Sequence, residues 1–257
     1  AALAALQARI LAQAMSAVRE LVADVLADQA EIVGIEVDLR VPLGEFEHGD
    51  QVTVTWRSFE LDPSAPPSSE AVTAVEHLAE SKGLPTEQVL EMMERVEAVA
   101  RGEGIEMDLR SSHPGNTFDA HRVLHLARAR GLQGAFKERI DRASFVEGLS
   151  VSDHAELTRV AVEAGLEESE VRAVLDSDRY ADEVRAEQQW ARSQGLSGVP
   201  FFVVDGRYGI SGAQPPATLV AVLERAWSER TEVDAAADPA AAESTGADRV
   251  PGSEPVT

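Results

Sequence analysis

The first thirty residues carry apolar side chains at the spacing of an amphipathic helix. Apolar residues recur every three or four positions from Leu3 to Val25, with charged residues between them. Such a stripe lies on one face of a helix with 3.6 residues per turn. We therefore predict a helix over residues 1–31 that packs against the rest of the chain. A coiled-coil seam, and with it a homodimer, is the alternative for the same stripe.

The apolar period then changes to two, which is the spacing of a half-buried β-strand. In the stretch EIVGIEVDLRV, apolar residues alternate with glycine and charged residues from Val33 to Val41. A second alternating stretch, QVTVTWRSFEL, begins at Gln51 and is followed by a cluster of prolines that ends it. These two stretches predict two strands.

From Ser68 to Trp190 the apolar spacing returns to three and four residues. The segments begin near Ser, Thr, Asn or Pro, and several end at Gly, as helices do. A short extended stretch at 105–109 interrupts them. The predicted helices cover residues 68–83, 85–102, 116–131, 133–146, 152–163, 169–177 and 179–194.

The stretch SGVPFFVVDGRYGISGAQPP, residues 197–216, contains a proline-led strand, a tight turn and a second strand. We place the strands at Phe201–Val204 and Tyr208–Ser211, because the Asp-Gly pair between them favours a primed hairpin turn. A last helix is predicted from Pro216 to Arg230. The remaining residues are rich in Ala, Pro, Asp and Ser and offer too little apolar surface to offset the entropy of ordering.

Together these elements predict an α/β fold in which a sheet layer carries a large all-helical insertion. The predicted division is a helix at 1–31, a sheet domain from 32–63 and 185–230, an insertion at 64–184, and a disordered acidic tail at 231–257.

Composition narrows the classes of function. The formal net charge of −22 argues against binding to nucleic acids or anionic lipid, since both need a basic face. No run of about 20 uncharged apolar residues is present, so we expect no membrane span. No secretory signal pattern opens the sequence, and we expect a cytoplasmic protein. The absence of cysteine excludes disulfides, thiolate zinc sites and thiol chemistry carried by this chain.

Three phrases carry a resemblance to a known family. VTVTWRSFELDPSAP, PGNTFDAHRVLHLARARG and SGVPFFVVDGRYGISGAQPP occur in this order, with the helices between them. The chain resembles the FrnE-like group of the DsbA-like branch of the thioredoxin superfamily, over roughly Phe46 to Trp227. The resemblance implies a thioredoxin-like sheet layer and an ancestral activity of thiol–disulfide exchange.

The resemblance also implies a substrate groove. In this fold a cis-proline opens the strand beside the catalytic dithiol, and we expect Val199-Pro200 to have that role. The backbone at Gly198, Val199 and Pro200 would pair with an extended peptide or with a small thiol such as glutathione. Gly198 has no Cβ and would let another backbone approach closely.

By the same resemblance, Asn116, Thr117 and Phe118 open the helical insertion beside this groove. The free N–H groups of a helix start at that place could receive a carboxylate of glutathione.

The dithiol that the resemblance implies is absent. Near its expected place the chain has Val41-Pro42-Leu43-Gly44 instead of a Cys-Pro-Trp-Cys-type motif. The first two strands of this fold are parallel, and a parallel crossover needs about a dozen residues or more. Only nine residues separate Val41 from Gln51. We therefore expect the first crossover helix to be missing along with its cysteines, with EFEHGD as its surviving end.

Two explanations of this N-terminal region remain open. Either the helix and strand before Val41 replace the missing element in a redox-inactive relative, or the first 45 or so residues are out-of-frame or misassembled sequence. An intact Cys-x-x-Cys codon pair in another reading frame would decide for the second.

Other polar residues are assigned structural roles. His121 and His125 are four positions apart on one predicted helix, a spacing that can bind zinc. No Glu follows the first His, so we predict packing and capping roles and no metal site. Ser58 could be compared with the serine of kappa-class glutathione enzymes, whose hydroxyl positions a thiol. That serine belongs to the start of the missing helix, so we do not assign its role to Ser58.

Three functions stay open. The first is a FrnE-like homologue with no catalytic residue that retains a groove for an extended peptide or a thiol. The second is a glutathione-dependent isomerase or transferase of the same fold, of the 2-hydroxychromene-2-carboxylate isomerase or kappa-class type, in which the thiol comes from the cofactor. The third is a non-functional truncated product.

Overall fold

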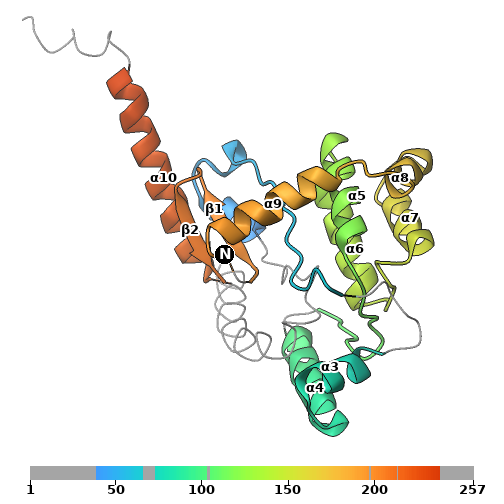
Figure 1. Ribbon diagram of the computed structural model, residues 1–257. Helices are drawn as coiled ribbons and strands as arrows, with labels where there is room; N and C mark the ends of the chain where they lie inside the picture. The colour runs from blue at the N-terminus through green and yellow to red at the C-terminus, as the bar shows by residue number, and fades with distance from the viewer. Residues whose placement is uncertain (1–38, 66–72, 103–104, 197, 213, 238–257) are drawn as a thin grey trace, which may run out of the picture.

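A computed structural model describes most of the chain after Leu39 (Figure 1). The described ranges are 39–65, 73–102, 105–196, 198–212 and 214–237. The predicted helix 1–31, most of the first predicted strand and residues 238–257 lie outside them. Within the described ranges, helices dominate and two short strands form the sheet. None of the described helices is long and apolar enough to cross a membrane.

The largest hydrophobic core lies among four helices on one side of the molecule (Figure 1). These are α5 (Phe118–Ala129), α6 (Gln133–Phe145), α7 (His154–Glu163) and α8 (Glu168–Leu175). Leu126 and Phe136 are fully buried in this core. Seven of the twelve residues of α5 are buried, and α5 packs against α6 and α8, which in turn hold α7.

A second, smaller core joins α3 (Ala74–Lys82) to α4 (Thr86–Gly102). Thr73 and Glu76 form a capping box that starts α3. The buried carboxylate of Glu97 accepts the backbone N–H of Leu109 at 2.9 Å and so ties the chain after α4 to this core.

The hairpin of β1 (Phe201–Val204) and β2 (Tyr208–Ser211) lies between α9 (Ala181–Ser193) and α10 (Pro216–Ala237) in Figure 1. The strands pair antiparallel, with Phe201 opposite Ser211 and Val204 opposite Tyr208. Asp205 and Gly206 both have positive φ, as a primed turn requires, which confirms the predicted turn.

The predicted helices from 68 to 194 are confirmed as α3 to α9, with shifts at their ends. The last helix also begins at Pro216, as predicted, but it continues to Ala237. Residues 231–237, which composition assigned to a disordered tail, therefore lie in α10.

The predicted extension of the first strand to Val41 is wrong. Arg40–Glu45 form a short helix, α2, followed by the 3-10 turn η1 (Gly49–Gln51). Pro42 fits in the first turn of α2, where its missing N–H would have no partner inside the helix. A Cβ at Gly49 would clash with the carbonyl oxygen of Leu43, so only glycine permits this return of the chain.

The connection between the two predicted strands is thus a short helix and a turn. His48, just before η1, stacks on Trp227 of α10 with ring centroids 4.1 Å apart. This contact anchors the segment that the sequence identified as the surviving end of the crossover helix.

The second predicted strand, 51–61, is not part of a sheet within the described residues. Residues 52–60 have neither helix nor strand assignment, and β1 and β2 are the strands that the described residues form. The predicted α/β sheet layer is therefore reduced, in this part of the chain, to one hairpin beside a large helical insertion.

Candidate functional site

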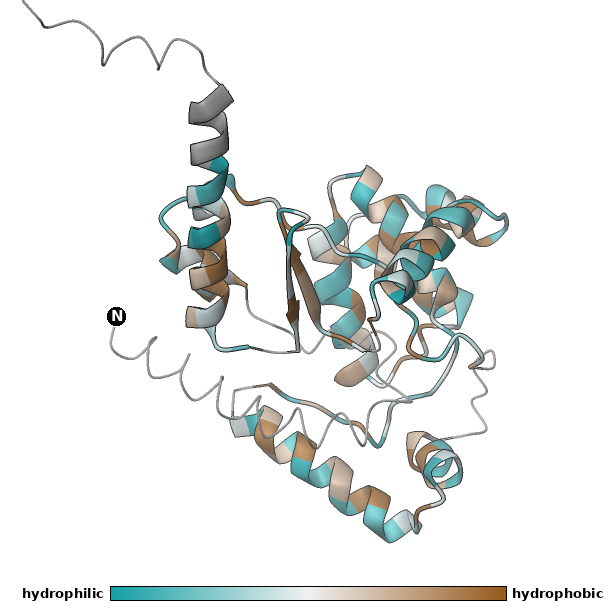
Figure 2. Cartoon of the chain, turned by 60° about the vertical axis from the view of Figure 1, so that its left-hand side comes forward, coloured by the Kyte–Doolittle hydropathy of each residue, from teal (hydrophilic) through white to brown (hydrophobic). Residues whose placement is uncertain are grey.

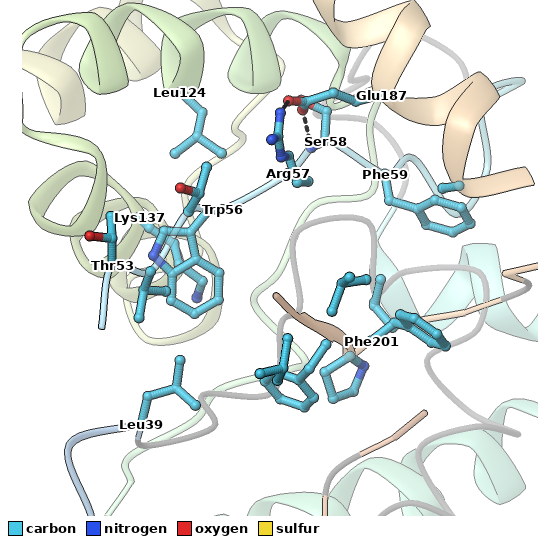
Figure 3. Close-up of a pocket in the computed structure, with 18 of the residues that line it drawn as sticks. Leu39, Thr53, Trp56, Arg57, Ser58, Phe59, Leu124, Lys137, Glu187 and Phe201 are labelled. Atoms are coloured by element: carbon cyan, nitrogen blue, oxygen red, sulfur yellow. Dashed lines mark hydrogen bonds and ion pairs between the residues drawn. The ribbon is translucent and has the colours of Figure 1, made fainter. Parts of the chain in front are cut away.

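A cavity of about 800 Å³ separates the chain at 52–59 from the β-hairpin. Residues 52–59 line one wall and Val199–Gly206 line the opposite wall. In Figure 3, Leu39, Trp56 and Phe201 surround this space. Side chains of α2, α5, α6 and α9 complete the lining. The cavity therefore lies where the proline-led strand faces the segment 52–59.

Two of the predicted groove residues lie in this lining. Val199 and Pro200 both face the cavity, and the peptide bond between them is cis, as predicted. The carbonyl of Pro200 accepts the N–H of Gly212 at 2.8 Å, which extends the hairpin beyond β1. A Cβ at Gly198 would meet no atom within 4 Å, so the space beside this residue is open.

The other predicted residues do not contribute to the cavity. Among the described residues that line it, none comes from Asn116, Thr117 or Phe118. The Oδ1 of Asn116 accepts the N–H of Phe118 at 2.9 Å, and its Nδ2 lies 3.4 Å from Glu60 Oε1. Thr117 is buried, and the guanidinium of Arg185 lies 5.3 Å from the ring of Phe118. Asn116 thus caps the start of α5 and joins it to Glu60, whereas the side chain of Thr117 makes no capping hydrogen bond.

Glu60 is the buried centre of that junction. Its carboxylate receives hydrogen bonds from Gln188 on α9 and from Asn116. Burial raises the pKa of Glu60, and these two hydrogen bonds partly oppose that rise. Asn116 is therefore committed to holding the chain at Glu60.

The wall at 52–59 is held by a glutamine side chain on α6. Gln133 accepts the N–H of Trp56 at 3.2 Å and donates to its carbonyl at 3.0 Å. The amide group thus occupies both backbone groups of Trp56, as a neighbouring strand would. Lys137, one turn further along α6, places its ammonium 4.6 Å from the centre of the Trp56 ring.

Glu187 on α9 holds the next two residues of the same wall (Figure 3). Its carboxylate accepts the N–H of Ser58 at 2.7 Å and the guanidinium of Arg57 at 2.6 Å. His125 Nε2 lies 3.2 Å away on α5. Burial alone would raise the pKa of Glu187, but the hydrogen bonds from His125, Arg57 and Ser58 outweigh it and lower the pKa to about 2.

Ser58, His125 and Glu187 do not form a nucleophilic triad. The base of a triad uses one ring nitrogen for the serine and the other for the carboxylate. Here the same atom, His125 Nε2, lies 3.2 Å from Ser58 Oγ and 3.2 Å from Glu187 Oε2. One ring nitrogen cannot both donate a hydrogen bond to Glu187 and accept the proton of Ser58. Ser58 is also only 2% exposed. The cluster docks the chain onto α5 and α9.

The two histidines of α5 lie in different surroundings. His121 is buried and contributes to the cavity lining, while His125 stacks on Tyr180 with centroids 6.0 Å apart. In the described part of the chain, no three His, Cys, Asp or Glu side chains are grouped so as to hold a metal ion.

Sequence reasoning missed the two residues that shape the cavity wall, Gln133 and Glu187. Each is a polar residue on an amphipathic helix, and such residues most often face solvent. The only signal in the sequence was the alternating stretch 52–59. Its strand periodicity predicts that the backbone has hydrogen-bond partners, but it does not indicate which residues supply them.

The comparisons with known proteins agree with this geometry. A family model described as DSBA-like thioredoxin domain matches residues 35–224. The chain belongs to this family.

Two individual proteins are similar to it. The crystal structure of a probable DsbA oxidoreductase from Streptomyces coelicolor superposes with a TM-score of 0.68 at 39% identity, covering 80% of this chain and 86% of that one. The uncharacterized protein YwbO of Bacillus subtilis is 25% identical over 158 residues, which are 61% of this chain and 74% of that protein.

The present chain differs from a dithiol enzyme in one decisive respect. It contains no cysteine, so it has no Cys-x-x-Cys motif and no thiolate of its own. The dithiol chemistry of a DsbA oxidoreductase therefore has no reacting atoms here.

Proposed function

We propose that this chain is a redox-inactive DsbA-like protein that binds an extended peptide at the Gly198–Pro200 end of the cavity. The proposal rests mainly on the backbone of Val199. Among the described residues, no hydrogen-bond partner is found for its N–H or its C=O. A free donor and acceptor on one residue, just before a strand, are what an incoming peptide backbone pairs with.

The surroundings of Val199 suit a peptide with apolar side chains. Pro200 and Phe201 continue the wall from Val199, and Leu43 of α2 also lines the cavity. In Figure 2 a strand of the hairpin is brown, the colour of hydrophobic residues, in keeping with the sequence FFVV of β1. Backbone pairing would supply affinity, and these apolar groups would select the side chains.

Binding in this proposal involves no covalent step. The absence of cysteine leaves recognition of the peptide as the part of the family's activity that the chain can perform. Glutathione, the alternative ligand, would bring its own thiol to the same backbone.

Titration with a fluorescent peptide of about seven residues, with valine at alternate positions, tests the proposal. Saturable binding to the full chain is expected. A peptide N-methylated at one backbone position should bind about tenfold more weakly, because it lacks the N–H for the Val199 carbonyl.

Val199→Asp should weaken binding by a similar factor. Val162→Asp is the matched control, since Val162 is an exposed valine on α7 that does not line the cavity. Equal binding by both variants, or no binding by the unmodified chain, would overturn the proposal. Calorimetric binding of glutathione without binding of the peptide would favour the glutathione-dependent alternative.

A further inference from the structure

Two arginines share the single carboxylate of Glu187, and we refer to Arg57 and Arg128 as the arginine pair. Arg57 Nη1 lies 2.6 Å and Arg128 Nη1 lies 3.9 Å from the same oxygen, Oε1. The other oxygen, Oε2, accepts the N–H of Ser58 at 2.7 Å and lies 3.2 Å from His125 Nε2. The two guanidinium groups are therefore close neighbours, because both reach one atom.

One carboxylate balances only one of these two guanidinium charges. Although burial opposes it, the hydrogen bonds to Glu187 lower its pKa to about 2, so this carboxylate is ionised at neutral pH. Arginine is charged at the same pH. The arginine pair and Glu187 together therefore carry one positive charge in excess.

This excess sets the arginine pair apart from the other ion pairs of the described chain. In every other group of ion pairs there, each arginine is matched by at least one carboxylate. Arg139, Arg142 and Arg159, for example, share three glutamates. At physiological salt, charges more than about 8 Å away are largely screened, so the local excess persists in a chain whose net charge is −22.

Both guanidinium groups have unused hydrogen-bond donors. Arg57 donates from Nη1 to Glu187, and the guanidinium of Arg128 makes no hydrogen bond within the described ranges. The side chains of Arg57 and Arg128 are 58% and 45% exposed, so unused N–H groups face solvent. A guanidinium presents five donors in a planar fork whose geometry fits a carboxylate. The arginine pair can therefore accept a second carboxylate.

The arginine pair lies at the edge of the cavity that contains Val199. Arg57 and Glu187 both line this cavity, and Arg128 reaches Glu187 from α5. Figure 3 shows Arg57 beside Glu187, across the drawn space from Phe201. Seven residues of extended peptide span about 23 Å, so a peptide held at Val199 can place a carboxylate elsewhere in the same lining.

We propose that Arg57 and Arg128 bind a carboxylate of the peptide, which is either an acidic side chain or the free C-terminus. This inference rests on the proposed peptide binding and names the class of peptide, which is apolar at alternate positions and carries one acidic group. The carboxylate balances the excess charge, and its oxygens accept hydrogen bonds from the unused N–H groups of the arginine pair. Because the pair is partly exposed, it contributes selectivity more than overall affinity.

Matched peptides test this inference with the full chain. The reference is the seven-residue valine peptide with glutamine at the intervening positions, acetylated and amidated at its ends so that it has no carboxylate. In one set of peptides glutamate replaces each glutamine in turn, and in another peptide the C-terminus is free. At least one of these carboxylates should strengthen binding about three- to tenfold, and the gain should shrink at high salt. A gain from glutamate assigns the site to a side chain, and a gain from the free C-terminus assigns it to the end of the peptide.

Variants of the arginine pair locate the effect. Arg57→Ala and Arg128→Ala should each reduce the gain to less than about twofold, while the carboxylate-free peptide still binds. Because Arg128 makes no side-chain hydrogen bond to the described residues, Arg128→Ala leaves the cavity wall in place even if Arg57→Ala loosens it. Arg172→Ala is the control and should keep the full gain, since Arg172 is similarly exposed but lies on α8, outside the cavity lining.

The results separate this inference from the proposed function. If the carboxylate-free peptide binds but no carboxylate strengthens its binding, the inference is overturned and the proposed function stands. The same holds if the gain survives in both variants of the arginine pair, or if Arg172→Ala abolishes it as well. If none of the peptides binds, both are overturned.

Discussion

The carboxylate of Glu187 accepts the backbone N–H of Ser58 at 2.7 Å, although 129 positions separate the two residues in the sequence. This bond joins α9 to the extended segment that forms one wall of the cavity. Because the same carboxylate also binds Arg57 and lies beside His125, a single side chain holds the segment against two helices.

Replacement of Glu187 should therefore destabilise the fold and loosen the cavity wall. Glu187→Ala removes a charged acceptor and leaves the Ser58 amide without its partner, so we expect a loss of about 2–3 kcal/mol in the free energy of unfolding. Urea denaturation measures it. Glu183→Ala, an exposed position one turn earlier on α9, is the control and should change stability by less than about 0.5 kcal/mol. Equal effects of both variants would contradict the assigned role.

The same residue predicts a pH dependence of stability. Its pKa is lowered from 4.5 to about 2 in the folded chain, so folding favours the ionised form. The stabilisation is complete above pH 4.5, the unfolded value, and is lost as the pH falls toward about 2. Denaturation midpoints of the unmodified chain should fall between about pH 5 and pH 2 more steeply than those of Glu187→Gln. Parallel curves for the two proteins would contradict this prediction.

Gln133 should matter for the same wall through a different element. Gln133→Ala removes both hydrogen bonds to the Trp56 backbone, and we expect a loss of about 1–2 kcal/mol with a change in tryptophan fluorescence. Gln133→Glu keeps the acceptor for the N–H but not the donor for the carbonyl. The free energy of unfolding of Gln133→Glu should therefore lie between those of the unmodified chain and of Gln133→Ala. A smaller loss for Gln133→Ala than for Gln133→Glu would contradict the role assigned to the two hydrogen bonds of Gln133.

Thiol–disulfide exchange should be absent. An insulin-reduction assay with dithiothreitol should proceed at the rate of the buffer alone, since the chain supplies no thiolate. The same preparation must bind peptide or show a cooperative denaturation curve, so that an inactive result does not reflect an unfolded sample. Catalysis above the buffer rate would contradict the redox-inactive assignment.

Much of the fold follows from local signals in the sequence. The Asp205-Gly206 pair needs positive φ at both residues, and Asp and Gly adopt it more readily than other residues, so the hairpin was predictable. Helix starts such as Asp153, which accepts the N–H groups of Ala155 and Glu156, depend on the side chain of one residue and the next turn. These features need no distant partner.

Two predictions failed because longer-range packing decided them. The alternation that ends at Val41 predicted a strand, yet Arg40–Glu45 form a helix whose following segment stacks on Trp227 of the distant α10. The segment 52–59 has strand periodicity, but side chains of Gln133 and Glu187 take the hydrogen bonds on one of its edges. Periodicity reports which side chains are apolar and not which groups satisfy the backbone.

The sequence by itself determined that this chain lacks thiol chemistry, that it is related to the DsbA-like proteins, and that Val199-Pro200 leads into a strand. Only the tertiary structure decided that Asn116 caps α5 and contacts Glu60 outside the cavity lining, and that two helical side chains hold the cavity wall. The physical reason is that residue identity and local spacing set chemistry and backbone preference. Which polar groups meet depends on how helices far apart in the chain pack together.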